Sequence, residues 1–430
     1  MNLSKLDECI RDCSSALRLN PSYVKSLYRR GTAHERKNEL YEALVDYTAT
    51  CIMEEFKKEE TIKTTDRVLR ELAKVKAGDI MKGKKDRPEL PSPVFITAYL
   101  DSFRGGYTVE GIPDPAPTAT HEHLKKAIEL VHSRDYNGAL NEITEATSGD
   151  LSALDAGLVS MAWNLLGTFK FLLADIDGAM EAFEKSIKAD KSNVNSIVKY
   201  AGCYMEKGDI PKALEEFDRA TETSPKDPDT FYHRGQVRFL LGSNNEALED
   251  YEKALRLDPT FVFNQIQIAV LQYRLGQVDK ALQGFDECSK RNPGSADVWN
   301  YYGEILLDMQ RFDDAVANFD KAIKIRPVSP LSYMNKAFSY IQRQDLAQAE
   351  QFCRKATEVD PKCDLAYAQW AQILMQQNKL DEALEKYEAA ISLSRTEPEV
   401  VQNVMFRTAA LAQRDVLQQF PQLASKLGMR

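Results

Sequence analysis

The feature that most constrains this sequence is a period of 34 residues. Alanines recur at this interval at Ala179, Ala213, Ala247, Ala281, Ala315, Ala349 and Ala383. Four residues after each alanine, the same register gives Phe183, Phe217, Tyr251, Phe285, Phe319, Cys353 and Tyr387. Self-similarity at a period of about 20–50 residues is typical of repeat architectures. The chain is therefore predicted to be a solenoid rather than a set of separate globular domains.

The residues within each period indicate a pair of packed helices. Twelve residues before each alanine stands a small residue, in the series Gly167, Ala201, Gly235, Ala269, Gly303, Ala337 and Ala371. A small residue lets the first helix approach the second closely, and the aromatic residue lies one turn from the alanine on the same face. Prolines 34 residues apart, from Pro225 to Pro361, end the second helices. This helix–turn–helix pattern resembles the tetratricopeptide repeat (TPR). The predicted fold is all-α, a TPR α-solenoid whose right-handed superhelix is divided into two blocks.

Upstream of this array the register persists with breaks. Gly31, Ala43 and Tyr47 mark one repeat, and Cys9 and Cys13 occupy the slots of a second helix whose partner would precede Met1. We therefore expect sequence to be missing at the N-terminus. Residues 1–78 are predicted to be the remnant of an N-terminal block with a capping helix over 60–78.

A change of composition separates the two blocks. Residues 79–119 are rich in proline and glycine and contain one short amphipathic piece over 94–103. We predict a linker here, either mobile or partly tucked into a groove. Residues 120–430 are predicted to form a C-terminal block of about eight repeats with a terminal cap.

Composition excludes several classes of function. The formal charge is 56 − 65 = −9, the wrong sign for a body that wraps nucleic acid or lies on an anionic membrane. Seven cysteines, an odd number in a long chain, do not suggest a disulfide framework. The longest apolar run, 158–174, is interrupted by Asn164 and Lys170, so a buried helix is favoured over a membrane span. This chain by itself is predicted to be soluble.

No recognisable catalytic motif is present. The sequence has no phosphate-binding loop, dinucleotide fingerprint, nucleophile elbow or HExxH pair. His121 and His123 lack a neighbouring set of ligands at metal-binding spacing, and Cys9 and Cys13 are interpreted as core thiols. We therefore predict no enzymatic activity, no cofactor and no metal site, and we expect function to lie in the concave surface lined by the first helices.

Two kinds of groove residue are predicted. Lys25 and Arg29 lie one turn apart on a first helix and suit a carboxylate, although ordinary surface charge explains their spacing equally well. The second block instead offers aromatic and amide side chains, which bind peptides without demanding one sequence. These candidates are Tyr232, His233, Gln236, Gln267, Tyr273, Asn300, Tyr301 and Asn335. For each of them, packing against an adjacent helix is an equally good interpretation.

Particular segments make the resemblance more specific. The chain resembles the mitochondrial outer-membrane preprotein import receptors of the seventy-kilodalton class, and Lys25 and Arg29 match the last pair of the family's five-residue clamp for chaperone tails. The segments that carry this resemblance are Leu19-Asn20-Pro21-Ser22-Tyr23-Val24-Lys25, Leu90-Pro91-Ser92-Pro93-Val94-Phe95-Ile96 and Tyr232-His233-Arg234-Gly235-Gln236. The other three clamp positions and the family's membrane anchor have no counterpart in this sequence.

The resemblance implies a non-enzymatic receptor on the cytosolic face of the mitochondrial outer membrane. Its implied partners are hydrophobic carrier-type preproteins with internal signals, other subunits of the outer-membrane translocase, and the C-terminal tails of heat-shock chaperones, bound weakly because the clamp is incomplete. No nucleic acid is expected as a partner. The alternative is a soluble TPR co-chaperone adaptor that binds chaperone tails. A TPR-bearing enzyme is disfavoured because the repeats leave only about 35 residues for another domain.

Overall fold

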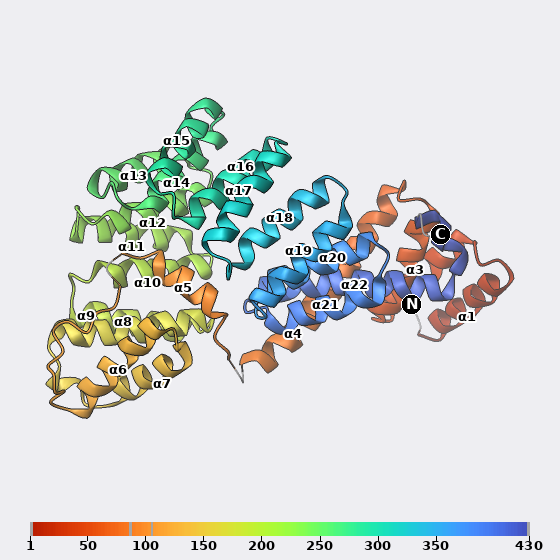
Figure 1. Cartoon of the computed structure of the whole chain (residues 1–430). Coiled ribbons are helices and arrows are strands. Elements are labelled where there is room, and N and C mark those ends of the chain that lie inside the picture. Colours follow the sequence, from red (N-terminus) through yellow and green to blue (C-terminus); the bar gives the residue numbers. More distant parts are fainter. Residues whose placement is uncertain (1–2, 86–87, 105, 428–430) are drawn as a thin grey trace. The chain divides into compact units, whose positions relative to one another are not determined.

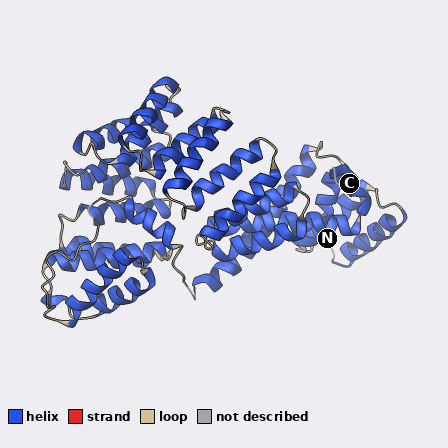
Figure 2. Ribbon diagram, in the orientation of Figure 1, coloured by secondary structure: helices blue, strands red, loops and turns tan. Residues whose placement is uncertain are grey.

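The computed structural model describes residues 3–85, 88–104 and 106–427. Over these ranges the chain is built from helices and loops and contains no strand, as Figure 2 shows, which confirms the all-α prediction. The chain divides into two compact units. Unit 1 comprises residues 1–87 and 340–430, and unit 2 comprises residues 88–339. In Figure 1, unit 1 contains both ends of the colour scale and unit 2 its middle.

Unit 2 is a series of helix pairs in which helices of 13 and 14 residues alternate over most of its length. It begins with α5 (Pro93–Asp101), a short helix that precedes the repeats. The paired helices are α6 (Ala119–Ser133), α7 (Tyr136–Ser148), α8 (Ala156–Leu172), α9 (Ile176–Ala189), α10 (Val194–Glu206), α11 (Ile210–Thr223), α12 (Pro228–Leu240), α13 (Asn244–Leu257), α14 (Val262–Arg274), α15 (Val278–Arg291), α16 (Ala296–Asp308) and α17 (Phe312–Ile325). A 3-10 turn (Leu151–Ala153) precedes α8, and α18 (Pro330–Gln342) spans the division between the units.

The repeat register of the sequence is the packing register of the structure. All seven alanines from Ala179 to Ala383 are fully buried, and the aromatic residue four positions later is buried in each repeat that has one. The turns between paired helices place Gly208, Gly242 and Gly276 at φ values of 74°, 78° and 75°, a left-handed conformation that glycine adopts without steric cost. Each turn reverses the chain, so that the second helix packs back on the first.

Unit 1 joins the two ends of the chain. Its helices are α1 (Leu3–Leu19), α2 (Val24–Arg36), α3 (Leu40–Met53), α4 (Glu59–Lys85), α19 (Leu346–Val359), α20 (Asp364–Gln376), α21 (Leu380–Leu393) and α22 (Glu397–Gln419), followed by a 3-10 segment (Pro421–Leu427). Helix α22 packs against α3 and α4. The hydroxyl of Tyr41 in α3 donates a hydrogen bond of 2.6 Å to Oδ2 of Asp415, and Val416 and Phe420 share a core with Leu44.

Some element boundaries differ from the expected ones. The capping helix expected over 60–78 is part of α4, which continues to Lys85. Within the expected linker, Leu90, Ile96 and Ile112 are buried in the core of unit 2. Residues 340–430 belong to the same compact unit as the N-terminal segment, because α22 contacts α3 and α4. The repeat pattern of the sequence did not predict this grouping, since a periodic pattern indicates only contacts between neighbouring repeats. The assignment of separate binding roles to residues 1–78 and 120–430 stays a prediction.

One further property of the helices bears on membranes. Among the helices that the structure describes, none is both long enough and apolar enough to cross a bilayer.

Candidate functional site

The predicted groove residues of α12 form a linked set. Nε2 of Gln236 donates a hydrogen bond of 3.0 Å to the hydroxyl of Tyr232, and Oε1 of Gln236 lies 2.9 Å from Nδ1 of His233. The Tyr232 ring packs edge-on against the ring of Phe261 at 5.1 Å. Tyr232 is only 3% exposed, so it supports the surface from beneath, while Gln236 is partly exposed.

The candidates on α14, α16 and α18 form further sets. Burial raises the pKa of Tyr301, and the nearby side chain of Gln267 partly offsets this effect. The side-chain amides of Asn300 and Asn335 both donate to Oε1 of Glu304, at 2.8 and 2.6 Å. The hydroxyl of Tyr273 donates to Oδ2 of Asp308 at 2.7 Å, independently of the other sets. Asn300 is buried, whereas Gln267, Tyr273, Tyr301 and Asn335 are partly exposed. Of the eight predicted residues, three are therefore buried and five are partly exposed, namely Gln236, Gln267, Tyr273, Tyr301 and Asn335.

Helix α5 and the residues after it lie against the first helices of unit 2. Figure 1 shows α5 beside α10. The ring of Tyr99 stacks on Phe171 of α8 at 5.5 Å, and the ring of Phe103 stacks on His233 of α12 at 4.4 Å. Burial lowers the pKa of His233 to about 4, so its imidazole is neutral at physiological pH and presents an uncharged face to Phe103.

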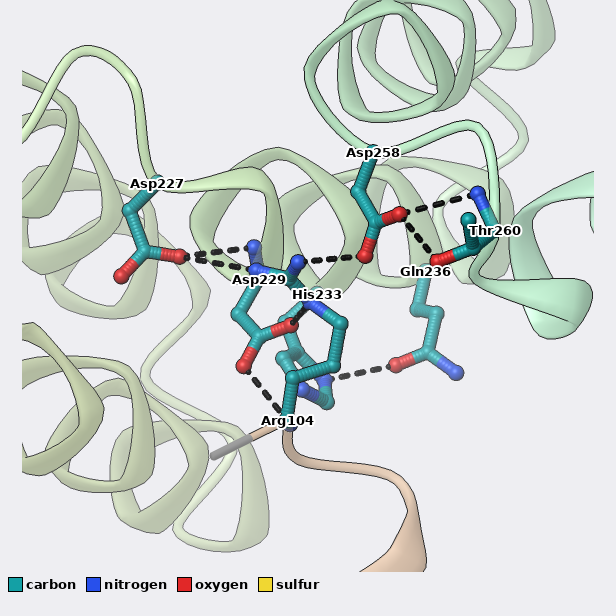
Figure 3. Close-up of polar contacts among 7 residues, drawn as sticks. All are labelled: Arg104, Asp227, Asp229, His233, Gln236, Asp258 and Thr260. Atoms are coloured by element: carbon teal, nitrogen blue, oxygen red, sulfur yellow. Dashed lines mark hydrogen bonds and ion pairs between the residues drawn. The ribbon is translucent and has the colours of Figure 1, made fainter. Parts of the chain in front are cut away.

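The next residue, Arg104, bridges carboxylates from two repeats. As Figure 3 shows, its guanidinium lies among Asp227, Asp229 and Asp258. Nε donates to Oδ1 of Asp229 at 2.6 Å, and Nη1 donates to Oδ2 of Asp258 at 2.7 Å. The backbone N–H of Arg104 also donates to Oδ2 of Asp229 at 2.9 Å. Asp229 therefore binds both the side chain and the backbone of one residue.

The local electrostatics favour this arrangement. Hydrogen bonds from Thr260 and from Arg104 hold the pKa of Asp258 at about 2, so this carboxylate is ionised at any physiological pH. Burial raises the pKa of Asp227. Burial alone would lower the pKa of Arg104, but its hydrogen bonds to Asp229 and Asp258 outweigh that effect and raise it. The site is therefore a strong acceptor for a guanidinium.

A second contact of the same segment involves a buried lysine. Nζ of Lys199 in α10 donates hydrogen bonds to the hydroxyl of Tyr107, to Oδ1 of Asn164 and to Oγ1 of Thr168, at 3.0, 3.1 and 3.0 Å. The same ammonium lies 4.7 Å from the centroid of the Phe103 ring. Lys199 is 4% exposed, and burial lowers its pKa to about 7. Aromatic rings and neutral oxygens thus replace the water that this ammonium would otherwise contact.

The two basic candidates in unit 1 have a different environment. Lys25 and Arg29 of α2 are both exposed, one helical turn apart. The adjacent Arg30 has a structural role, because it forms two hydrogen bonds, of 2.8 and 2.6 Å, with the buried carboxylate of Asp46. Lys25 and Arg29 therefore remain accessible to an acidic ligand.

Sequence reasoning missed the contacts of Arg104 and Lys199. A signal for each is present in the sequence. The amphipathic piece over 94–103 ends in Phe103-Arg104, and Asp227, Asp229 and Asp258 cluster at the starts of two consecutive repeats. Lys199 is a basic residue at a groove position of its helix, one turn after Asn195.

The histidines and cysteines have ordinary structural partners. Nδ1 of His121 lies 2.8 Å from Oγ1 of Thr118, and Nδ1 of His123 lies 2.7 Å from Oε2 of Glu142. Within residues 3–85, 88–104 and 106–427, no three or more histidine, cysteine, aspartate or glutamate residues are grouped as a metal site. All seven cysteines are free thiols.

Comparison with known proteins agrees with the fold. Models described as tetratricopeptide repeat match residues 172–230, 228–261, 266–330, 306–373 and 365–397, which together exceed half of the chain. The chain belongs to the tetratricopeptide repeat family, and its fold is the predicted TPR solenoid.

Individual relatives are more specific. The crystal structure of yeast Tom70 superposes with a TM-score of 0.70 and 27% sequence identity, covering 99% of this chain and 89% of that one. Human mitochondrial import receptor subunit TOM70 is 31% identical over 220 residues, which are 48% of this chain and 35% of the relative. Rat sperm-associated antigen 1 is 27% identical over 194 residues, 42% of this chain and 21% of that protein. The matched stretches thus span about a third or less of the curated relatives. The resemblance to the seventy-kilodalton import receptors is confirmed.

Proposed function

We propose that this chain is a non-enzymatic receptor that binds mitochondrial preproteins on the first helices of unit 2. The observation that carries the proposal is the similarity to yeast Tom70, which extends over 99% of the chain at 27% identity. The proposed ligands are hydrophobic, carrier-type preproteins with internal signals, delivered at the cytosolic face of the mitochondrial outer membrane. Other subunits of the outer-membrane translocase are proposed as further partners.

The chemistry of the partly exposed groove residues supports this proposal. Gln236, Gln267 and Asn335 offer amides that can donate to and accept from a peptide backbone. Tyr273 and Tyr301 add aromatic surface that can pack against apolar side chains. Because neither kind of contact specifies one side chain, such a surface suits a family of hydrophobic segments bound at roughly micromolar affinity.

Lys25 and Arg29 support a second contact, with the acidic C-terminal tail of a heat-shock chaperone. Both side chains are exposed, and each can form a charge-assisted hydrogen bond to a carboxylate. A receptor with both surfaces could take a preprotein from the chaperone that delivers it.

The test is fluorescence anisotropy with peptides derived from the internal segments of mitochondrial carriers and the full chain. Replacing Gln267 and Tyr273 together by alanine is expected to weaken binding about tenfold, because two partly exposed contacts are lost without opening the core. Gln283→Ala on α15 is the matched control, since its side chain is exposed on a second helix of a repeat. Equal affinities for the double variant and the control, or binding only of acidic tail peptides, would contradict the proposal and favour the adaptor.

A further inference from the structure

The contacts of Phe103 and Arg104 define a recognition site on unit 2. We propose that His233, Asp229 and Asp258, here named the aromatic–acidic site, bind a partner segment in which an aromatic residue is directly followed by arginine. In the structure the chain's own Phe103-Arg104 occupies this site, so an incoming segment has to displace it. The inference rests on the proposed function, because it names a class of segment that the same surface would select.

The aromatic half of the site is a stacking platform. The rings of Phe103 and His233 lie 4.4 Å apart at an interplanar angle of 27°. Because burial keeps the imidazole neutral, His233 behaves as a flat apolar surface rather than as a cation. The ammonium of Lys199 approaches the Phe103 ring at 4.7 Å, and a cation is attracted to the face of an aromatic ring. An aliphatic residue at this place would lose both contacts.

The basic half of the site selects arginine over lysine. Two nitrogens of one guanidinium donate to two carboxylates that belong to different repeats, at 2.6 and 2.7 Å. A single ammonium cannot reproduce this planar fork. Three carboxylates, those of Asp227, Asp229 and Asp258, lie within 3.6 Å of one guanidinium, so the site carries more negative than positive charge even when it is occupied.

The geometry also shows why the internal segment can be exchanged for a partner. The side chains of Arg104 and Asp258 are 27% and 21% exposed, so this edge of the site contacts solvent, while Asp229 is 9% exposed. A partner with the same two side chains forms the same contacts, and the free energy of exchange is then governed by local concentration. A tethered segment has an effective concentration of about millimolar, which weakens the apparent affinity of a free competitor. Removing the internal arginine should therefore expose the site.

The experiment uses the full chain and a fluorescent peptide with the sequence of residues 96–104, Ile-Thr-Ala-Tyr-Leu-Asp-Ser-Phe-Arg. Arg104→Ala is expected to tighten binding of this peptide at least about tenfold relative to the unsubstituted chain. Adding Asp258→Asn to Arg104→Ala is expected to reverse most of that gain. Peptides that carry lysine in place of the arginine, or alanine in place of the phenylalanine, should bind about tenfold more weakly than the parent peptide.

Arg256→Ala is the matched control, because Arg256 forms an exposed ion pair with Glu252 on α13. If Arg104→Ala binds the peptide no more tightly than Arg256→Ala, and its circular dichroism spectrum is native, the segment is a permanent part of the fold and the proposal is wrong. Arg104→Lys serves as a second variant in case the alanine variant unfolds. Lysine keeps the positive charge but cannot donate to both carboxylates as the guanidinium does, so Arg104→Lys should tighten peptide binding by a smaller factor. An unchanged affinity of this variant would also count against the proposal.

Carrier-derived peptides separate the two levels of the argument. If they bind the chain but do not respond to Arg104→Ala or Asp258→Asn, the receptor function stands and the aromatic–acidic site is wrong. If the 96–104 peptide behaves as expected but carrier peptides do not bind, the site stands and the proposed function is wrong.

Discussion

Gly303 of α16 faces the ring of Phe319 in α17 so closely that a Cβ on residue 303 would lie 2.5 Å from Cε1 of that ring. The same relationship holds for Gly167 and Phe183, where the corresponding distance is 2.7 Å. Real Cβ contacts are not this short, so a side chain at either position would force the paired helices apart. At Gly167 and Gly303 the glycine thus matches the position of the aromatic ring on the second helix, whereas other repeats carry an alanine at the same register position, namely Ala201, Ala269, Ala337 and Ala371.

Gly303→Ala is therefore expected to lower the free energy of unfolding by about 1–3 kcal/mol, the usual range for overpacking a core. Gly202→Ala is the control, because Gly202 lies inside α10 and a Cβ there would meet no atom within 4 Å. Alanine is favoured over glycine within a helix, so the control should be neutral or stabilising by up to about 1 kcal/mol. Urea denaturation followed by circular dichroism measures both. Two variants of equal stability would show that the close contact is relieved at no cost.

Asp250→Ala is expected to destabilise unit 2 by about 3 kcal/mol. The buried carboxylate of Asp250 accepts hydrogen bonds from Arg234, at 3.0 and 2.7 Å, and from Arg238 at 2.7 Å. Its removal leaves two partly buried guanidinium groups without this partner. The control is Asp286→Ala, whose pair with Lys290 is exposed on α15 and is screened by solvent, so that it should contribute little to stability. Thermal melts that shift equally for both variants would contradict this expectation.

Lys199 predicts a pH dependence of stability. Its pKa is about 7 in the folded chain, below the ordinary value of 10.5, because burial outweighs the attraction of Asp229. Between these two pH values the unfolded chain holds a proton that the folded chain has lost. Unfolding then takes up a proton, so stability rises with pH across this window, by up to about 1.4 kcal/mol per pH unit.

The measurement compares the unsubstituted chain with Lys199→Met at pH 7.5, 8.5 and 9.5. Other groups titrate in both proteins, so the difference between the two urea midpoints isolates Lys199. The midpoint of the unsubstituted chain is expected to rise relative to that of the variant as the pH increases. A difference that stays constant over this range would show that Lys199 keeps an ordinary pKa.

Arg29→Ala is expected to weaken binding of a peptide that ends in an acidic chaperone-type tail by roughly tenfold or more. The exposed guanidinium can give a charge-assisted hydrogen bond that contributes about 1.5–3 kcal/mol to binding. Arg70→Ala is the control, since Arg70 is exposed in the same unit but pairs with Asp66 on α4. Isothermal titration calorimetry at low and moderate salt compares the two. Equal affinities for the two variants would place the tail elsewhere.

The repeat architecture could be predicted from the sequence because its contacts are local and recur. Ala247 is buried between the two helices of its repeat, and an alanine is buried at the same position of each of the other six repeats. The same packing requirement therefore appears in the sequence as alanine at a constant spacing. The packing of α22 on α3 could not be predicted in this way. The contact between Tyr41 and Asp415 joins residues 374 positions apart, and it is not repeated elsewhere in the sequence pattern.

The candidate site was predictable only in part, for a related reason. Gln267 and Tyr273 could be placed on groove-facing helices from the period alone. The contact of Arg104 with Asp229 joins a segment without any period to the start of a repeat, 125 residues away. Periodicity also does not distinguish a side chain on the surface from one beneath it, as the 3% exposure of Tyr232 shows.

The packing of α22 against α3 and α4 has a consequence for biosynthesis. During translation Leu44 emerges from the ribosome before all of unit 2, whereas Val416 and Phe420, which share its core, emerge after unit 2. The apolar face of the first helices must therefore wait uncovered while unit 2 is synthesised and folds, since domains generally fold as they emerge. Nascent chains halted before residue 397 should recruit general chaperones through this face, and chains in which α22 has left the ribosome should not.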